Sequence, residues 1–151
     1  MIAAVSSCRE DIYIYPSSSE NVDSPQATGV DGFYLLNEGN MGSNKCTLDY
    51  FDETTGNYVR NIYAERNPSA VKELGDVGND LEIHGSRLYA VINCSHKVEV
   101  MKAADARRIA QIDIPNCRYA VGHGRYLYVS SYVSPTQGDA RAPLGAVFKV
   151  D

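Results

Sequence analysis

The chain has 151 residues, of which 44% are apolar and 22% charged, and its formal net charge is −5. This composition is that of a folded globular chain rather than a disordered one. No cluster of Lys and Arg stands out, which argues against the basic surface that binds nucleic acid or an anionic membrane. No stretch approaches the roughly 20 apolar residues of a membrane-spanning helix.

The N-terminal stretch MIAAVSSCRED resembles the end of a bacterial lipoprotein signal, with a short apolar run before Ser6, Ser7 and Cys8. In such signals the cysteine is acylated and becomes the mature N-terminus. We therefore expect residues 1–8 to be a signal remnant and Cys8 to anchor the chain to a membrane through a lipid. The alternative is an ordinary chain terminus with an unrelated cysteine.

Residues 9–29 contain four Ser and two Pro, together with Asn21 and Gly29, which predicts a polar tether. In residues 30–151, short apolar runs alternate with turn residues, and this pattern predicts one domain of β-strands. The one helical turn expected is NPSAVKELG, residues 67–75, with Ser69 as its cap and Gly75 as its stop.

A recurring four-strand unit organises residues 30–151. IHGSRLYAV matches GHGRYLYVS without a gap, and LDYFDETTGNYVRNI matches VEVMKAADARRIAQI in the same way. A four-stranded repeat of about 40 residues is typical of a β-propeller blade. We expect three partial blades, the first without its first strand, with strands at residues 34–36, 48–51, 58–62, 81–83, 89–92, 98–101, 108–112, 119–121, 128–131 and 147–150.

The copies differ in length at the loops that follow the second and the fourth strand of each unit, and not at the two other turns. In a propeller these variable loops share one end, and loops on a rigid scaffold usually carry binding. Harmless drift in loop length is the alternative. The amides, hydroxyls, charges and aromatic rings of these loops suit a large polar organic ligand. The candidate ligand-binding residues are Asn37, Glu38, Asn40, Asn79, Asp80, Asn93, Arg118, Tyr119, Tyr132, Gln137 and Arg141.

Other polar residues have simpler interpretations. The recurring Tyr34, Tyr89 and Tyr128 are expected to pack between blades. His84 and His123 fall in equivalent turns of adjacent units, so we expect turn residues there and no metal site. We expect no cofactor, because the chain has no phosphate-binding loop and no catalytic motif.

Two further features are weaker. Asp76 and Asp80 in GDVGND lack the dense acidic spacing of a calcium loop. Cys46, Cys94 and Cys117 have no metal-binding spacing, and we expect free buried thiols.

The segments YVSS, YAVINCSHKVEVM and FYLLNEGNMGSNKCTLDYFDETTG are similar to the YVTN-type repeats of YncE-like propellers. With LGDVGNDLEIHG, they resemble the surface lipoproteins of gut Bacteroidetes that include the cobalamin-binding BtuG group. The resemblance covers about residues 30 to 151 and implies a seven-bladed propeller, of which this chain holds fewer than three complete blades.

The resemblance implies a lipid-anchored protein of the outer-membrane surface that captures a ligand. Its ligand would be a corrinoid such as vitamin B12, passed to an outer-membrane transporter. A propeller that binds proteins or glycans at the cell surface is the alternative, and a propeller enzyme such as a lyase or quinoprotein ranks third. We expect no enzymatic activity, because no catalytic set of residues is visible.

Overall fold

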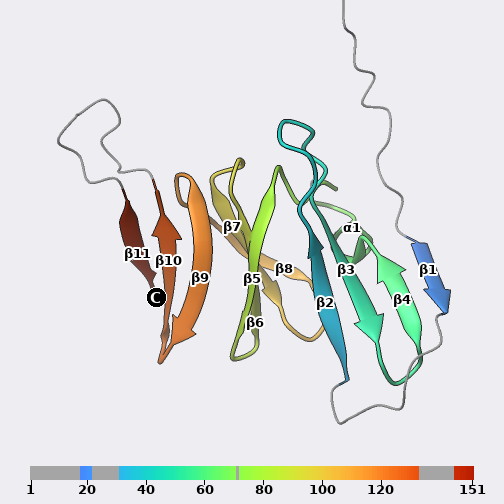
Figure 1. Ribbon diagram of the computed structural model, residues 1–151. Coiled ribbons are helices and arrows are strands. Elements are labelled where there is room, and N and C mark those ends of the chain that lie inside the picture. Colours follow the sequence, from blue (N-terminus) through green and yellow to red (C-terminus); the bar gives the residue numbers. More distant parts are fainter. Residues whose placement is uncertain (1–17, 22–30, 71, 133–144) are drawn as a thin grey trace, which may run out of the picture.

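The computed structural model describes residues 18–21, 31–70, 72–132 and 145–151. These residues form three antiparallel sheets and one short helix, which confirms the expected all-β class (Figure 1). The predicted lipidation site Cys8 and the predicted ligand-binding residues Gln137 and Arg141 lie outside the described residues. No helix of the described part is long and apolar enough to cross a membrane.

The second sheet is a complete up-and-down meander, as the repeat predicts. Its strands pair in chain order, and Tyr89 lies opposite Val100 in the central pair. Short turns join the strands, so each strand pairs with its neighbour in sequence. The strands are β5 (Gly78–His84), β6 (Arg87–Ile92), β7 (Lys97–Lys102) and β8 (Arg108–Asp113).

The third sheet contains the first three strands of the same unit. The middle strand pairs with both others, and Tyr128 lies opposite Val121 on one side and Lys149 on the other. The strands are β9 (Cys117–His123), β10 (Tyr126–Ser131) and β11 (Ala146–Val150).

The first sheet includes four residues of the predicted tether. Ser18–Asn21, inside the expected tether of residues 9–29, form a strand that pairs with the outer edge of the sheet, with Ser19 opposite Val59. No described strand pairs with the other outer edge, which agrees with a first copy that lacks its first strand. The sheet order is β1-β4-β3-β2, formed by β1 (Ser18–Asn21), β2 (Gly32–Asn37), β3 (Thr47–Asp52) and β4 (Asn57–Arg60).

The predicted helix is wrong in its position. The helix α1 spans Ile62–Arg66, before the expected segment at residues 67–75. Asn61 adopts a left-handed backbone, with φ of 51°, which ends β4 early and turns the chain into the helix. Ile62 and Tyr63 are buried between the first two sheets, so tertiary packing selects this five-residue helix.

The core consists of two layers between neighbouring sheets. Leu88, Ala90 and Ile92 of β6 belong to the layer shared with the first sheet, while Tyr89 and Val91 belong to the layer shared with the third. Successive residues of a strand point to opposite faces, so β6 is buried on both. This burial explains its nearly continuous apolar sequence RLYAVI.

Contacts at equivalent positions of the repeat join each sheet to the next. Tyr34 packs into the layer between sheets one and two, and Tyr89 into the layer between sheets two and three, as predicted for the repeated tyrosine. Directly after β2, the Glu38 carbonyl accepts a hydrogen bond from the first residue of β5. Directly after β6, the Asn93 side chain donates to the carbonyl of Cys117, the first residue of β9.

Candidate functional site

The loops of variable length that the structure describes gather at one end of the sheets, as predicted. The β2–β3 and β6–β7 loops lie at this end, and the β3–β4, β5–β6 and β9–β10 turns lie at the other (Figure 1). Asp76 links the loops, because its carboxylate accepts from the Gly42 and Asn44 amides and its own amide donates to Ser95 Oγ at 2.8 Å. The loop end is therefore a hydrogen-bonded unit of several segments.

The three predicted residues of the first loop have different roles. Asn37 is half-buried at the end of β2, and its Nδ2 donates to Thr47 Oγ1 at 3.0 Å and to Asp49 Oδ2 at 2.8 Å. Glu38 and Asn40 are exposed, and the Asn40 carbonyl accepts two hydrogen bonds from Ser43. Asn37 lines the pocket on the first sheet that is described below, and the other two residues do not line it.

Three other predicted residues connect the second and third sheets. Asn79 Nδ2 donates to the Arg118 carbonyl at 2.5 Å, Asp80 Oδ2 accepts from the Ala120 amide at 2.7 Å, and Asn93 Nδ2 donates to the carbonyl of Cys117 at 2.8 Å. Asn93 is also buried. These side chains satisfy backbone groups of the third sheet, so each has a structural role. Their predicted role in ligand binding stays a prediction.

The last three described candidates form one cluster at the end of the third sheet. The guanidinium carbon of Arg118 lies 5.8 Å from the ring centroid of Tyr119 and 5.4 Å from that of Tyr132. Both tyrosines are more than half exposed. A guanidinium between two aromatic rings combines hydrogen-bond donors with flat apolar surface, and it can hold a planar ligand that carries oxygen acceptors.

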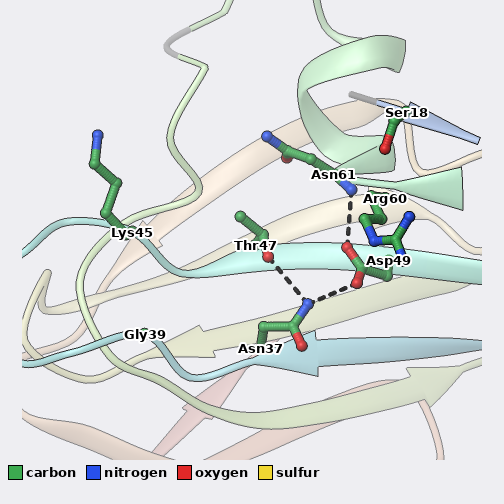
Figure 2. Close-up of a pocket in the computed structure, with 8 residues that line it drawn as sticks. All are labelled: Ser18, Asn37, Gly39, Lys45, Thr47, Asp49, Arg60 and Asn61. Carbon is green, nitrogen blue, oxygen red and sulfur yellow. Dashed lines mark hydrogen bonds between the residues drawn. The ribbon is translucent and has the colours of Figure 1, made fainter. Parts of the chain in front are cut away.

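A pocket of about 490 Å³ that polar residues line lies on the first sheet (Figure 2). Leu48 and Val59 pack toward the second sheet, so the adjacent Asp49 and Arg60 place the pocket on the opposite face. It opens where β2 and β4 end and β3 begins, so the first variable loop forms part of its wall. Its lining combines hydroxyl, amide, carboxylate and cationic groups, contributed by Ser18, Asn37, Gly39, Lys45, Thr47, Asp49, Arg60 and Asn61.

Asp49 is the central acceptor of this pocket and is only 6% exposed. Its Oδ2 accepts from Asn37 Nδ2 and from the Tyr58 hydroxyl at 2.7 Å, and its Oδ1 accepts from the Asn61 amide at 2.8 Å. Burial, together with the bond to Asp49, raises the pKa of Tyr58 to about 12. The three donors are neutral, and they hold the carboxylate in one orientation.

The two cations that line the pocket have acidic neighbours. Arg60 Nη2 lies 2.6 Å from Glu20 Oε1 of β1, and Lys45 Nζ lies 3.9 Å from Glu73 Oε1. The sequence analysis did not single out Asp49, Lys45 or Arg60. The sequence does contain a signal for Asp49. The gapless match of the third strands aligns Asp49 with Glu99, so an acidic residue recurs inside an apolar strand.

The histidines and cysteines hold no metal cluster in the described part of the chain. His84 Nε2 donates to the Gly124 carbonyl at 2.8 Å and so joins two turns of neighbouring sheets. Cys46, Cys94 and Cys117 are free, and the first and last of them are buried. Burial raises the pKa of Cys46 to about 12 and that of Cys117 to about 11, so both thiols stay protonated at neutral pH.

Comparison with known proteins finds no matching family model and no curated protein of significant similarity.

Proposed function

We propose that the chain is part of a β-propeller that captures a ligand at its loop end. Sheets one to three are then successive blades. Three observations support this assignment: the complete meander of the second sheet, the equivalent tyrosines that pack on the next sheet, and the hydrogen bonds at equivalent positions after β2 and β6. Each blade contributes its variable loops to the same end.

One observation carries the binding function: the exposed cluster in which Arg118 lies against the rings of Tyr119 and Tyr132. Such a cluster suits a large, flat ligand with amide oxygens at its rim, because the rings cover its faces and the guanidinium donates to its acceptors. A corrinoid has this chemistry, and it is the ligand implied by the resemblance of the repeat sequences to the cobalamin-binding group.

Calorimetry with cyanocobalamin tests this function. Arg118→Ala and Tyr132→Ala should each lower the affinity by about tenfold, which corresponds to the loss of one buried polar contact. His123→Ala is the matched control, because His123 is exposed at the opposite end of β9 and should leave binding unchanged. His84→Ala is a poorer control, because His84 bonds to the third sheet.

Saturable binding that is lost in the loop variants and kept in the control supports capture at the loop end. Loss in His123→Ala alone would place the ligand at the other end. If the wild-type chain shows no saturable heat, the corrinoid assignment fails, and the alternative of a propeller that binds proteins or glycans at the cell surface takes its place.

The cellular setting of this proposal is the outer-membrane surface, with Cys8 as the lipid-bearing residue and an outer-membrane transporter as the partner. Metabolic labelling with a fatty acid tests the anchor. The wild type should be labelled and Cys8→Ser should not, whereas equal labelling of both would refute lipidation at this residue.

A further inference from the structure

An exposed histidine, His96, lies in the β6–β7 loop at the loop end and has an uncommon backbone conformation. Its φ is 55°, in the left-handed region, where the β5–β6 and β9–β10 turns have Gly85 and Gly124. Ala106 of the β7–β8 turn also has a positive φ but is fully buried, so core packing explains that residue and does not explain His96. Such strain persists where the surroundings enforce it, and it is concentrated at functional sites.

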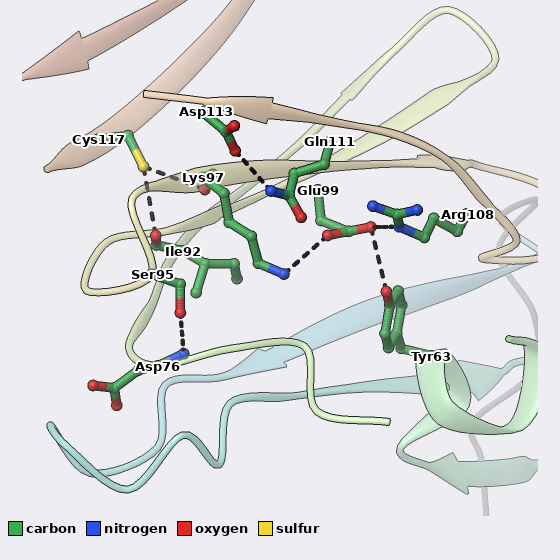
Figure 3. A network of polar contacts seen from close by, with 10 residues as sticks. All are labelled: Tyr63, Asp76, Ile92, Ser95, Lys97, Glu99, Arg108, Gln111, Asp113 and Cys117. Atoms are coloured by element: carbon green, nitrogen blue, oxygen red, sulfur yellow. Dashed lines mark hydrogen bonds and ion pairs between the residues drawn. The ribbon is translucent and has the colours of Figure 1, made fainter. Parts of the chain in front are cut away.

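The loop that carries His96 is clamped to the start of β9. Asn93 Nδ2 donates to the carbonyl of Cys117 at 2.8 Å, and Cys117 Sγ donates to the carbonyl of Lys97 at 3.3 Å (Figure 3). The carbonyl of His96 itself accepts from the Ile114 amide at 2.9 Å. These hydrogen bonds on both sides of His96 fix its position relative to the third sheet.

The ring of His96 is held in one orientation and one protonation pattern. The backbone amide of Asn116 donates to His96 Nδ1 at 3.0 Å. A backbone amide can only donate, so Nδ1 carries no proton and the neutral ring carries its proton on Nε2. No group in the described part of the chain accepts a hydrogen bond from Nε2. His96 therefore presents one oriented N–H donor at the loop end.

We infer that His96 is a further binding residue of the loop end and that its Nε2–H donates to an acceptor oxygen of the captured ligand. This role rests on the proposed function, because it assigns His96 to the same site as Arg118. Asn116 precedes Arg118 by two residues, so His96 Nδ1 lies within about 10 Å of the Arg118 amide nitrogen. A ligand as large as a corrinoid spans this distance while it contacts the cluster of Arg118.

The two donors define the chemistry of the ligand more closely. The ligand needs at least two oxygen acceptors, one for the guanidinium of Arg118 and one for the imidazole N–H of His96, such as carboxamide groups at separate points of its rim. Because Nε2 is protonated, it has no lone pair for a metal ion. His96 therefore recognises the rim of the ligand and does not coordinate a central metal.

His96→Asn tests the donor separately from the clamp. The side-chain oxygen of asparagine can replace Nδ1 as the acceptor of the Asn116 amide, and asparagine tolerates a positive φ. The variant should keep the urea midpoint of unfolding and should bind cyanocobalamin about tenfold more weakly by calorimetry, because one buried polar contact is lost. His123→Asn is the matched control, since His123 is exposed at the opposite end of β9 and should change neither quantity.

A second variant and a measurement without ligand complete the test. His96→Gly removes the ring and adopts a positive φ freely, so the loop should keep its shape while the affinity falls at least tenfold. Nitrogen NMR of the free chain should place the proton of His96 on Nε2, and the His96→Asn spectrum identifies the signal.

Three results would overturn the inference and leave the proposed function in place. They are wild-type affinity in either His96 variant, an affinity that falls only together with the urea midpoint, and a proton on Nδ1 in the free chain. If the wild-type chain shows no saturable binding of cyanocobalamin, the proposed function fails and the role of His96 fails with it.

Discussion

The second and third sheets carry the same tyrosine at the same strand position and give it different environments. Tyr89 of β6 is 6% exposed and packs in the layer between the two sheets. Tyr128 of β10 is half-buried, and its ring lies 6.4 Å from that of Tyr126 on the face that no other described sheet covers. The repeat therefore determines which way a side chain points, while the presence of a neighbouring sheet decides whether that side chain is buried.

The largest effect is expected from truncating the buried member of this pair. Tyr89→Ala should lower the free energy of unfolding by about 3–5 kcal/mol, as for other large aromatic residues in a core. Tyr128→Ala should lower it by no more than about 1 kcal/mol. Urea denaturation of both variants measures the difference, and equal losses would break the comparison.

A smaller effect is expected at high pH from the layer between the first two sheets. Burial, with a contribution from nearby Glu99, raises the pKa of Tyr63 from 10.0 to about 12. Between pH 10 and pH 12 the unfolded chain releases this proton and the folded chain retains it, so the folded state loses stability as the pH rises. Over this range the shifted pKa of Tyr63 lowers the free energy of unfolding by about 2–3 kcal/mol.

Tyr63→Phe removes this titration and should flatten the dependence of the unfolding free energy on pH above pH 10. Cys46 titrates in an overlapping range in both proteins, so the difference between the two curves isolates Tyr63. Parallel curves for wild type and variant would show that the hydroxyl is not protected by the fold.

A third prediction concerns the close approach of the second and third sheets. A Cβ atom on Gly122 would lie 2.1 Å from Cγ of His84, so β9 can pass this histidine only with glycine at this position. Gly122→Ala should therefore cost about 1–3 kcal/mol of stability. In the His84→Ala background the same substitution should cost less, and a double-mutant cycle by urea denaturation measures this coupling. Additive losses would contradict the contact.

The smallest effect on folding is expected on the open face of the third sheet. Val147 is 70% exposed, so Val147→Lys should change the free energy of unfolding by no more than about 0.5 kcal/mol. It should, however, reduce self-association, because uncovered apolar sheet faces and strand edges promote pairing between molecules.

Light scattering at increasing concentration measures this association, which we expect for the wild-type chain. Met41→Lys, which changes an exposed apolar residue of a loop, is the control and should have little effect. A wild type that remains a clean monomer with a cooperative thermal transition would contradict the expectation.

The sequence alone predicted every described strand except β1, the strand order within the second and third sheets and the end at which the described variable loops gather. These features depend on local patterns: alternation of apolar residues, turn residues at fixed spacing and a gapless repeat. The sequence also singled out Arg118, Tyr119 and Tyr132, which form the exposed cluster, because they lie in or next to strand ends that the repeat located.

Tertiary structure decided the features that join distant segments. The strand β1 forms because the edge of β4 is open to it, and the polar sequence of Ser18–Asn21 has no apolar alternation that predicts a strand. The helix α1 forms where Ile62 and Tyr63 find a buried layer, although five residues are too few to show a helical period. The pocket around Asp49 follows the same principle, because the strands and the loop that line it meet only when the sheet is paired.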